Sequence, residues 1–294
     1  MRAELADLGI AFRRMALWGA GAFYLYVGWW VWRLGAGQDS YAYWLAWHRH
    51  SMYSIAPSHF GAFLYSPVFA QIIWPLTRFP WPVFFWVWTV AGFAVFAWLL
   101  WPLHWRHRIP ALCFCVPQVI DGNVWPLFAV VILFGFRRPA LWAIPLLVKI
   151  TSAMGLVWFA ARREWHLLAR AVAAAALLTG VSAAISPHLW AEWIHLLIHG
   201  GSVATPAFTG GLNIPLRLRL PVAVGLAVYG ARKDRVGFLA AAVAIGSPVF
   251  NAGLTLSTFS VFAALPRLHG RRPKTVAATQ PRPLMSPQLE RAQT

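Results

Sequence analysis

Apolar segments long enough to cross a lipid bilayer recur along the chain, and only Asp121 and Lys149 place a charged residue within them. A run of about 18 apolar residues suffices for a membrane-spanning helix, because an α-helix rises about 1.5 Å per residue. Hydrophobic residues make up 60% of the sequence and charged residues 11%, a composition that excludes a single water-soluble globule. The sequence therefore predicts an all-α, polytopic membrane protein. The apolar runs cover residues 15–32, 79–103, 110–136, 139–161, 172–190 and 236–266.

The excess of basic residues fits a membrane protein better than a nucleic-acid-binding protein. The chain has 25 Lys and Arg against 8 Asp and Glu, but the segments between them are too apolar to expose a basic groove. We expect no nucleic-acid partner, and we attribute the charge to anionic lipid and to the positive-inside rule. Cys113 and Cys115 are expected to be core residues, not a disulfide pair.

The charge pattern predicts three parts of the chain. Residues 1–14 form a cytoplasmic N-terminus before a retained signal anchor. Residues 15–269 form a membrane domain with outer loops at about 33–60 and 187–216. Residues 270–294 are too polar to bury and are predicted to be a disordered, basic cytoplasmic tail. The expected location is the plasma membrane, crossed several times, with both ends in the cytoplasm.

Three of the long runs are predicted to be hairpins of short helices. Their bends are placed at Asp121-Gly122-Asn123, at Lys149 and near Ser247-Pro248, so that most basic residues fall inside. Arms of about 9 to 13 residues reach only about 14 to 20 Å, so their ends should line an enclosed or wet cavity. Residues 60–103 then need an odd number of crossings, and Arg78 fits either side. Basic residues left outside are Arg33, Arg49, Arg78, Lys149, Arg217 and Arg219. Polar residues expected together on the outer face are Asp39, Asp121, Asn123, Lys149, Asn213 and Asn251.

Asp39 is the acidic residue best placed for chemistry. Most of the eight carboxylates lie in cytoplasmic, tail or basic-loop sequence, which leaves Asp39, Asp121 and Glu192. Asp39 follows the first apolar run where a helix can begin, with Ser40 as its cap. Two interpretations stay open: Asp39 stabilises the start of that helix, or it acts on a substrate. One aromatic face of this interfacial helix would carry Tyr41, Trp44, Leu45 and His48.

Lys149 needs an anionic partner. An ammonium group at bilayer depth costs about 2.5 to 3.5 kcal/mol. One candidate partner is Asp121, in a structural ion pair, and the other is a substrate phosphate, which Arg217 and Arg219 on the same predicted side would also bind.

A second amphipathic helix is predicted over residues 187–199. His188, Glu192, His195 and His199 share one of its faces, a pattern typical both of a polar interfacial face and of metal ligands. The first interpretation is favoured, and no metal site is expected. The sequence has no Walker loop, dinucleotide fingerprint, zinc-protease pair or nucleophile elbow.

The order of these features resembles glycosyltransferase family 87 of the GT-C superfamily. Phe63-Leu64-Tyr65-Ser66-Pro67 is similar to the Tyr-x-Pro stretch of that family, and the loop with Asp39 and Tyr41 resembles its acidic first outer loop. The segments placed like its later motifs are Asp121-Gly122-Asn123-Val124, Val148-Lys149-Ile150-Thr151, Asn213 and Ser247-Pro248.

The resemblance implies a GT-C-like helical bundle that transfers a sugar without a cofactor. The donor would be a polyprenyl-phosphate sugar, mannose or another hexose or pentose, and the acceptor a hydroxyl of a glycolipid or glycan on the extracytoplasmic face. Asp39 would be the general base of an inverting transfer. Lys149, Arg217 and Arg219 would bind the donor phosphate. Residues expected to line the substrate pocket are Tyr41, Tyr65, Asp121, Asn123 and Asn213.

Two other classes of function compete with this hypothesis. A small-solute or lipid transporter would also have broken helices with polar residues, but it predicts an inverted internal repeat, and the sequence has none. A non-catalytic scaffold or degenerate transferase would fit the absence of Gln from the Gly-Gln-x-Asn position, where this chain has Asp121-Gly122-Asn123.

Overall fold

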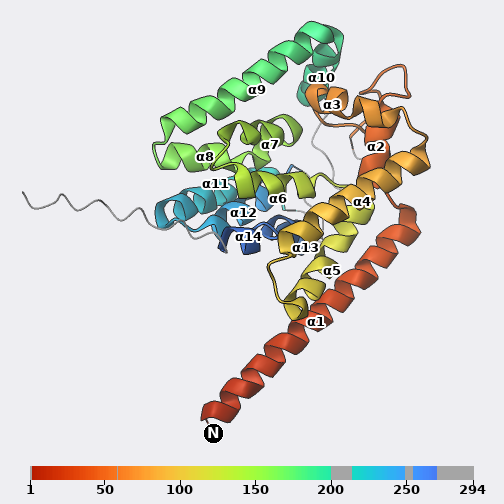
Figure 1. The fold of residues 1–294 in the computed structure, drawn as a ribbon. Helices are drawn as coiled ribbons and strands as arrows, with labels where there is room; N and C mark the ends of the chain where they lie inside the picture. The colour runs from red at the N-terminus through yellow and green to blue at the C-terminus, as the bar shows by residue number, and fades with distance from the viewer. Residues whose placement is uncertain (1, 58, 200–213, 249–253, 270–294) are drawn as a thin grey trace, which may run out of the picture.

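The structure, a computed structural model, describes residues 2–57, 59–199, 214–248 and 254–269. Over these ranges the chain is all-α and has no strand, as the sequence predicts. Three helices are long: α1 (Arg2–Gly35), α4 (Trp81–Leu100) and α9 (Trp165–Ile185). In Figure 1, α1 runs along one side of the molecule and α9 lies at the opposite side.

The other helices are shorter and surround the centre of the molecule. They are α2 (Gln38–Ala46), α3 (Pro67–Thr77), α5 (Trp105–Asp121), α6 (Trp125–Phe134), η1 (Pro139–Trp142), α7 (Ala143–Val148), η2 (Ile150–Ser152), α8 (Met154–Ala161), α10 (Pro187–His199), α11 (Leu216–Lys233), α12 (Val236–Ile245), α13 (Leu254–Phe262) and α14 (Leu265–His269). Asn213, Asn251 and the predicted tail 270–294 lie outside the described residues.

The three predicted bends are breaks between helices. The chain leaves α5 at Asp121 and enters α6 at Trp125, Lys149 separates α7 from η2, and α12 ends just before Ser247. The arms α6, α8 and α12 have 10, 8 and 10 residues. With 17 residues α5 is longer than an expected arm, because it includes the basic segment that begins at Trp105. The side of the membrane that each bend faces stays a prediction.

The apolar run predicted at 172–190 does not form one helix. Its first part belongs to α9, which ends at Ile185, and its second part begins α10 at Pro187. Proline has no backbone N–H to donate and restricts the residue before it, so the helix cannot continue through Ser186. The amphipathic helix predicted over 187–199 is confirmed as α10.

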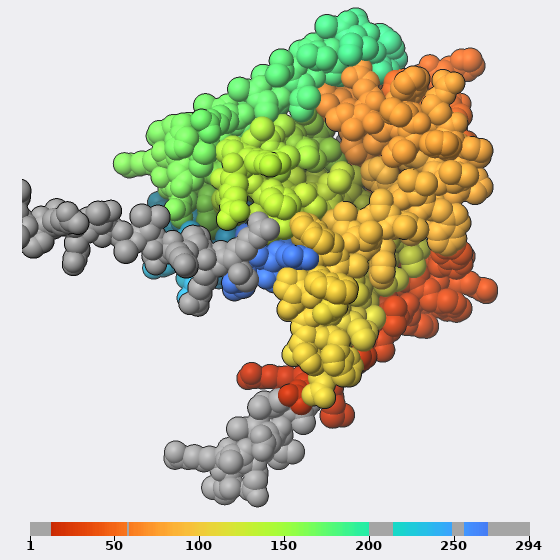
Figure 2. All heavy atoms as spheres, viewed as in Figure 1, coloured from red at the N-terminus to blue at the C-terminus, as the bar shows by residue number. Residues whose placement is uncertain are grey.

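Two helices in the described part of the chain, α4 and α9, are long and apolar enough to cross a membrane. Their surfaces carry large exposed apolar side chains, among them Trp86 and Phe93 on α4 and Leu177 and Ile185 on α9. In water such surfaces are rare on a single chain, whereas lipid accommodates them. Figure 2 shows α9 and α10 as a continuous green band along one edge of the molecule. These features indicate a membrane protein.

Small residues allow the inner helices to pack closely. Ala223, Ala227 and Ala231 recur every four residues on α11 and are all buried, on the helix that packs against α8 and α12. Such small-residue stripes are the usual means of close helix packing in lipid, where apolar burial gives little driving force. The spacing predicts one helix face, and the structure shows that this face is an interface.

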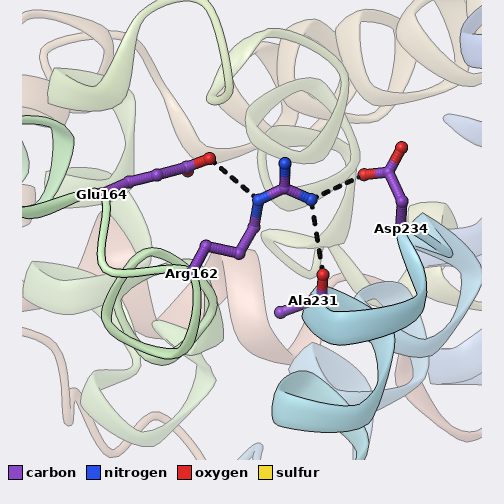
Figure 3. A network of polar contacts seen from close by, with 4 residues as sticks. All are labelled: Arg162, Glu164, Ala231 and Asp234. Atoms are coloured by element: carbon purple, nitrogen blue, oxygen red, sulfur yellow. Dashed lines mark hydrogen bonds and ion pairs between the residues drawn. The ribbon is translucent and has the colours of Figure 1, made fainter.

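An ionic clamp joins two helix pairs. Arg162, directly after α8, donates to Glu164 and to Asp234, each over 2.8 Å, and to the carbonyl oxygen of Ala231 over 3.3 Å (Figure 3). The α8–α9 and α11–α12 connections therefore lie side by side. The side chain of Asp234 is 82% exposed, so the clamp contributes modestly to stability.

Candidate active site

A single amide joins the predicted base to the predicted cation. Asn123 donates a hydrogen bond from its Nδ2 to Oδ2 of Asp39 over 2.6 Å. Its Oδ1 accepts hydrogen bonds from Nζ of Lys149, over 3.3 Å, and from the backbone N–H of Val124, over 2.8 Å. Three segments far apart in the sequence therefore meet at Asn123, and a carboxylate and an ammonium lie on its two sides.

Two glycine turns bring α2 against the end of α5. Gly37 precedes α2 with φ of 78°, and its N–H donates to the carbonyl oxygen of Ile120 over 2.8 Å. Gly122 ends α5 with φ of 80°, and an added Cβ there would collide with Ser40. Both conformations favour glycine, which has no side chain to clash. This close backbone contact places Asp39 beside Asn123.

The prediction that Ser40 caps the helix was wrong. The helix starts earlier, at Gln38, so Asp39 and Ser40 lie inside its first turn. Ser40 is completely buried, and its Oγ donates to the carbonyl oxygen of Gly37 over 3.1 Å. The left-handed conformation of Gly37 allows the early start, and no local sequence pattern indicates it. Ser40 therefore stabilises the turn that supports Asp39.

Lys149 lies in a nearly closed environment at the break between α7 and η2. Only 9% of it is exposed, and its Nζ lies 4.9 Å from the ring centre of Trp125, a cation–π distance. Neither Asp39 nor Asp121 is within ion-pair distance of Lys149 in the described structure. An ammonium has three N–H donors, and Asn123 accepts one of them. The other two have no hydrogen-bond partner among the described residues and could bind an anion.

A hydrogen bond joins the bend near Ser247-Pro248 to the bend at Lys149. The hydroxyl of Thr151, two residues after Lys149, donates to the carbonyl oxygen of Gly246. On the other side of this bend, Arg219 donates to the carbonyl oxygens of Ile245 over 2.6 Å and of Ser247 over 2.9 Å. Carbonyls at the end of a helix lack partners within the helix, and a cation there is favoured by the helix dipole. Arg219 therefore stabilises the C-terminal end of α12.

Buried tyrosines support the other side of α2. The hydroxyl groups of Tyr43 and Tyr65 lie 3.0 Å apart, and the hydroxyl of Tyr53 donates to the carbonyl oxygen of Tyr65 over 2.9 Å. All three side chains are buried. Tyr41 instead stacks on Phe60 with ring centres 5.2 Å apart. The tyrosines thus hold the first outer loop in place, and Tyr65 has less room to contact a substrate than expected.

The electrostatics of Asp39 combine opposing effects. Burial raises the pKa of the Asp39 carboxyl above its ordinary value, while the charge of Lys149 and the hydrogen bond from Asn123 lower it. The net result is a raised pKa, because removal from water disfavours the charged form. A carboxylate with a raised pKa is a stronger base than an ordinary one, which suits proton abstraction.

The comparison with protein families identifies the family of this chain. The model of glycosyltransferase family 87 matches residues 63–280, well over half of the chain. The chain belongs to glycosyltransferase family 87. Family membership makes it a membrane glycosyltransferase and confirms the resemblance inferred from its motifs. No curated protein and no solved structure matched the chain.

The family match covers most of the cluster. Asn123 and Lys149 lie inside the matched segment, whereas Asp39 precedes it. The carboxylate is therefore linked to the family 87 core of this chain by its hydrogen bond to Asn123, not by the family match itself.

The structure does not bring all the predicted site residues together. Arg217 is exposed near the start of α11, and within the described part of the chain no hydrogen bond or ion pair joins it to the cluster. Arg219 contacts backbone carbonyls instead. Asp121, at the end of α5, does lie with the cluster, because its buried carboxyl interacts with Asp39, Lys149 and Asn123. Asn213 lies outside the described residues. The described residues include no group of three or more His, Cys, Asp and Glu arranged to hold a metal. On α10, Glu192 accepts a hydrogen bond from Ser51 over 3.0 Å.

Several supporting residues were not found from the sequence. Trp125 contacts Lys149, and Nε1 of Trp88 donates to the carbonyl oxygen of Gly122 over 2.8 Å. Tyr43 packs against Trp88 with ring centres 5.4 Å apart. In a chain with 19 Trp, no local pattern distinguishes these from lipid-facing rings. One signal was available for Tyr43, which lies four residues after Asp39 and so on the same side of α2.

Proposed function

We propose that this family 87 enzyme transfers a sugar from a polyprenyl-phosphate donor to a hydroxyl acceptor on the extracytoplasmic face, with inversion at the anomeric carbon. The sugar is mannose or another hexose or pentose, and the acceptor is a glycolipid or glycan. The observation that carries the proposal is the Asp39–Asn123–Lys149 bridge. It holds a carboxylate and an ammonium group on the two sides of one amide.

The chemistry needs these two groups. The acceptor oxygen attacks the anomeric carbon while the bond from that carbon to the phosphate oxygen breaks. The hydroxyl proton passes to the carboxylate of Asp39, and the electron pair of the broken bond leaves with the phosphate. A phosphate leaving group needs positive charge and no proton, so Lys149 with its two remaining N–H donors fits that role. One carboxylate is then enough.

The donor lipid fits the surface of the protein. Long helices with exposed apolar side chains support a location in a bilayer, where a polyprenyl tail would stay during the reaction. Aromatic side chains can also stack on sugars, although most of the Trp residues serve better as interfacial anchors. No cofactor has a role in this scheme.

Replacement of Asp39 by Asn tests the proposal. Asn has the same shape and can still accept the hydrogen bond from Asn123, but it cannot take a proton. We expect Asp39→Asn to abolish transfer from a radiolabelled polyprenyl-phosphate sugar in membranes, with expression and melting temperature unchanged. Transfer by wild-type protein is the positive control.

Glu192→Gln is the matched control. Glu192 is an outer-loop carboxylate by prediction, and it contacts Ser51 and not the cluster. It should retain transfer. Sugar transfer by Asp39→Asn would show that Asp39 is not the base. Loss of transfer in Glu192→Gln alone would instead identify Glu192, on α10, as the base. Wild-type protein without transfer from any such donor would favour the scaffold or transporter.

A further inference from the structure

A large cavity lies away from the proposed active site. Its volume is about 860 Å³, and it is lined by parts of α6, α11, α12, α13 and α14 together with the connection before α12. The walls are mainly apolar, with Leu133, Phe136, Leu226, Phe238 and Phe262 among the lining residues. A cavity of this size and character accommodates an organic ligand with a hydrocarbon part.

Two arginines line this cavity at connections between helices. Arg137 follows α6 and Arg235 precedes α12; both line the cavity and both are exposed. Neither has a side-chain hydrogen bond or ion pair with any residue that the structure describes. The acidic residue of the lining, Asp234, is already paired with Arg162. The cavity therefore presents two arginines to an anion, and its nearby carboxylate is neutralised.

The C-terminal segment of the chain is basic, like the two arginines of the cavity. It follows α14, whose last residue, His269, also lines the cavity. Residues 270–294 contain the basic residues Arg271, Arg272, Lys274, Arg282 and Arg291, against the acidic residue Glu290. This segment has the same sign of charge as the two arginines, so an anionic ligand complements them better.

We propose that the cavity binds an anionic phospholipid. The acyl chain occupies the apolar interior, and Arg137 and Arg235 bind the phosphate in charge-assisted hydrogen bonds. Basic pockets between membrane helices on the cytoplasmic side are typical sites for such headgroups. The position agrees with the predicted cytoplasmic side of the α11–α12 connection. This inference is independent of the proposed catalytic function.

Native mass spectrometry of the full-length protein in a non-ionic detergent tests it. The protein is titrated with phosphatidylglycerol or with phosphatidylcholine of the same acyl chains. We expect phosphatidylglycerol to bind more tightly. In Arg137→Gln with Arg235→Gln, its affinity should fall about 25-fold, or about fivefold for each arginine, as expected for basic residues at an anionic lipid surface.

Two further variants make the result specific. Arg106→Gln removes another exposed arginine, which stacks on Trp105 at 5.4 Å and does not line the cavity; it should bind like wild type. Ala241→Leu fills part of the cavity and should weaken binding while both arginines remain, so it also tests the site if the double variant does not fold. Equal binding of the two lipids, or no loss in the two cavity variants, would overturn the proposal. Displacement of phosphatidylglycerol by equimolar polyprenyl phosphate would also overturn it, because the cavity would then select the donor lipid.

Discussion

Asn123 holds the carboxylate of Asp39 at 2.6 Å, although the two residues are 84 positions apart in the sequence. The same amide accepts a hydrogen bond from Lys149, so its orientation is fixed from both sides. An amide in this position cannot rotate without breaking one of these bonds. Asn123 is therefore a positioning residue for the proposed base, and its expected role changes from lining the substrate pocket to orienting Asp39.

Replacement of Asn123 by Ala should change both rate and pH dependence. Misplacement of a reacting group by about 1 Å can cost about 100-fold in rate, so we expect kcat to fall about 10- to 100-fold. The lost hydrogen bond normally lowers the pKa of Asp39. Its removal raises that pKa further, and because the base must be deprotonated, the acidic limb of the rate profile should move to higher pH. The measurement is sugar transfer across a pH series.

Gln38→Ala is the control for this variant, since Gln38 is exposed and directly precedes Asp39 on α2. It should leave the rate and the acidic limb unchanged. An Asn123→Ala profile with lower rate but an unmoved acidic limb would contradict the contact with Asp39 as the cause.

Replacement of Lys149 by Ala should weaken binding of the donor more than binding of the acceptor. A hydrogen bond to a charged group contributes about 1.5 to 3 kcal/mol, so we expect the KM for the polyprenyl-phosphate sugar to rise about tenfold or more. The KM for the acceptor should change little. Lys233→Ala, at the exposed end of α11, is the control. An equal rise in both KM values would identify Lys149 as a purely structural group.

The helix breaks were predictable from local chemistry. Asp121-Gly122-Asn123, Lys149 and Ser247-Pro248 each interrupt an apolar run with residues that lipid does not accept, and each is a break in the structure. The grouping of Asp39, Asn123 and Lys149 also followed, because short arms must end in a common enclosed space. The sequence alone did not show which of these polar residues contact one another, because the contacts join segments far apart in the chain.

Arg219 shows why the rest of the site could not be predicted. Its position in the sequence suggested a phosphate ligand as strongly as that of Arg217. Arg219 donates to the carbonyl oxygen of Ile214 nearby in the sequence, but also to that of Ile245 at the end of α12, 26 residues later. Likewise, the bridging role of Asn123 depends on an 84-residue separation, which no local pattern encodes.

Replacement of Gly122 by Ala should separate α2 from the end of α5. The residue has φ of 80°, and the added methyl group would meet both the side chain and the backbone nitrogen of Ser40. We expect a loss of about 2 kcal/mol of stability or more, from the strained backbone and the overpacked contact. The melting temperature should fall and sugar transfer should fall with it.

Gly180→Ala is a matched control for that change. Gly180 lies within α9, and an added methyl group there meets nothing within 4 Å. Because alanine favours helix more than glycine does, this variant should melt at the wild-type temperature or slightly above. A Gly122→Ala protein as stable as Gly180→Ala would show that α2 does not rest on the Gly122 turn.

Replacement of Arg217 and replacement of Arg219 by Ala should have different effects on stability and on donor binding. Arg219 is buried and bonded to the carbonyl oxygens at the end of α12, so Arg219→Ala should lower the melting temperature through a loss of about 2 kcal/mol. Arg217 is exposed, so Arg217→Ala should melt like wild type. If Arg217 binds the donor phosphate, as its position on the predicted outer side suggests, the KM for the donor should rise in this variant alone. The measurements are thermal unfolding in detergent and donor KM for both variants. An Arg219→Ala protein with unchanged stability and a raised donor KM would restore the role in phosphate binding that the sequence predicted for Arg219.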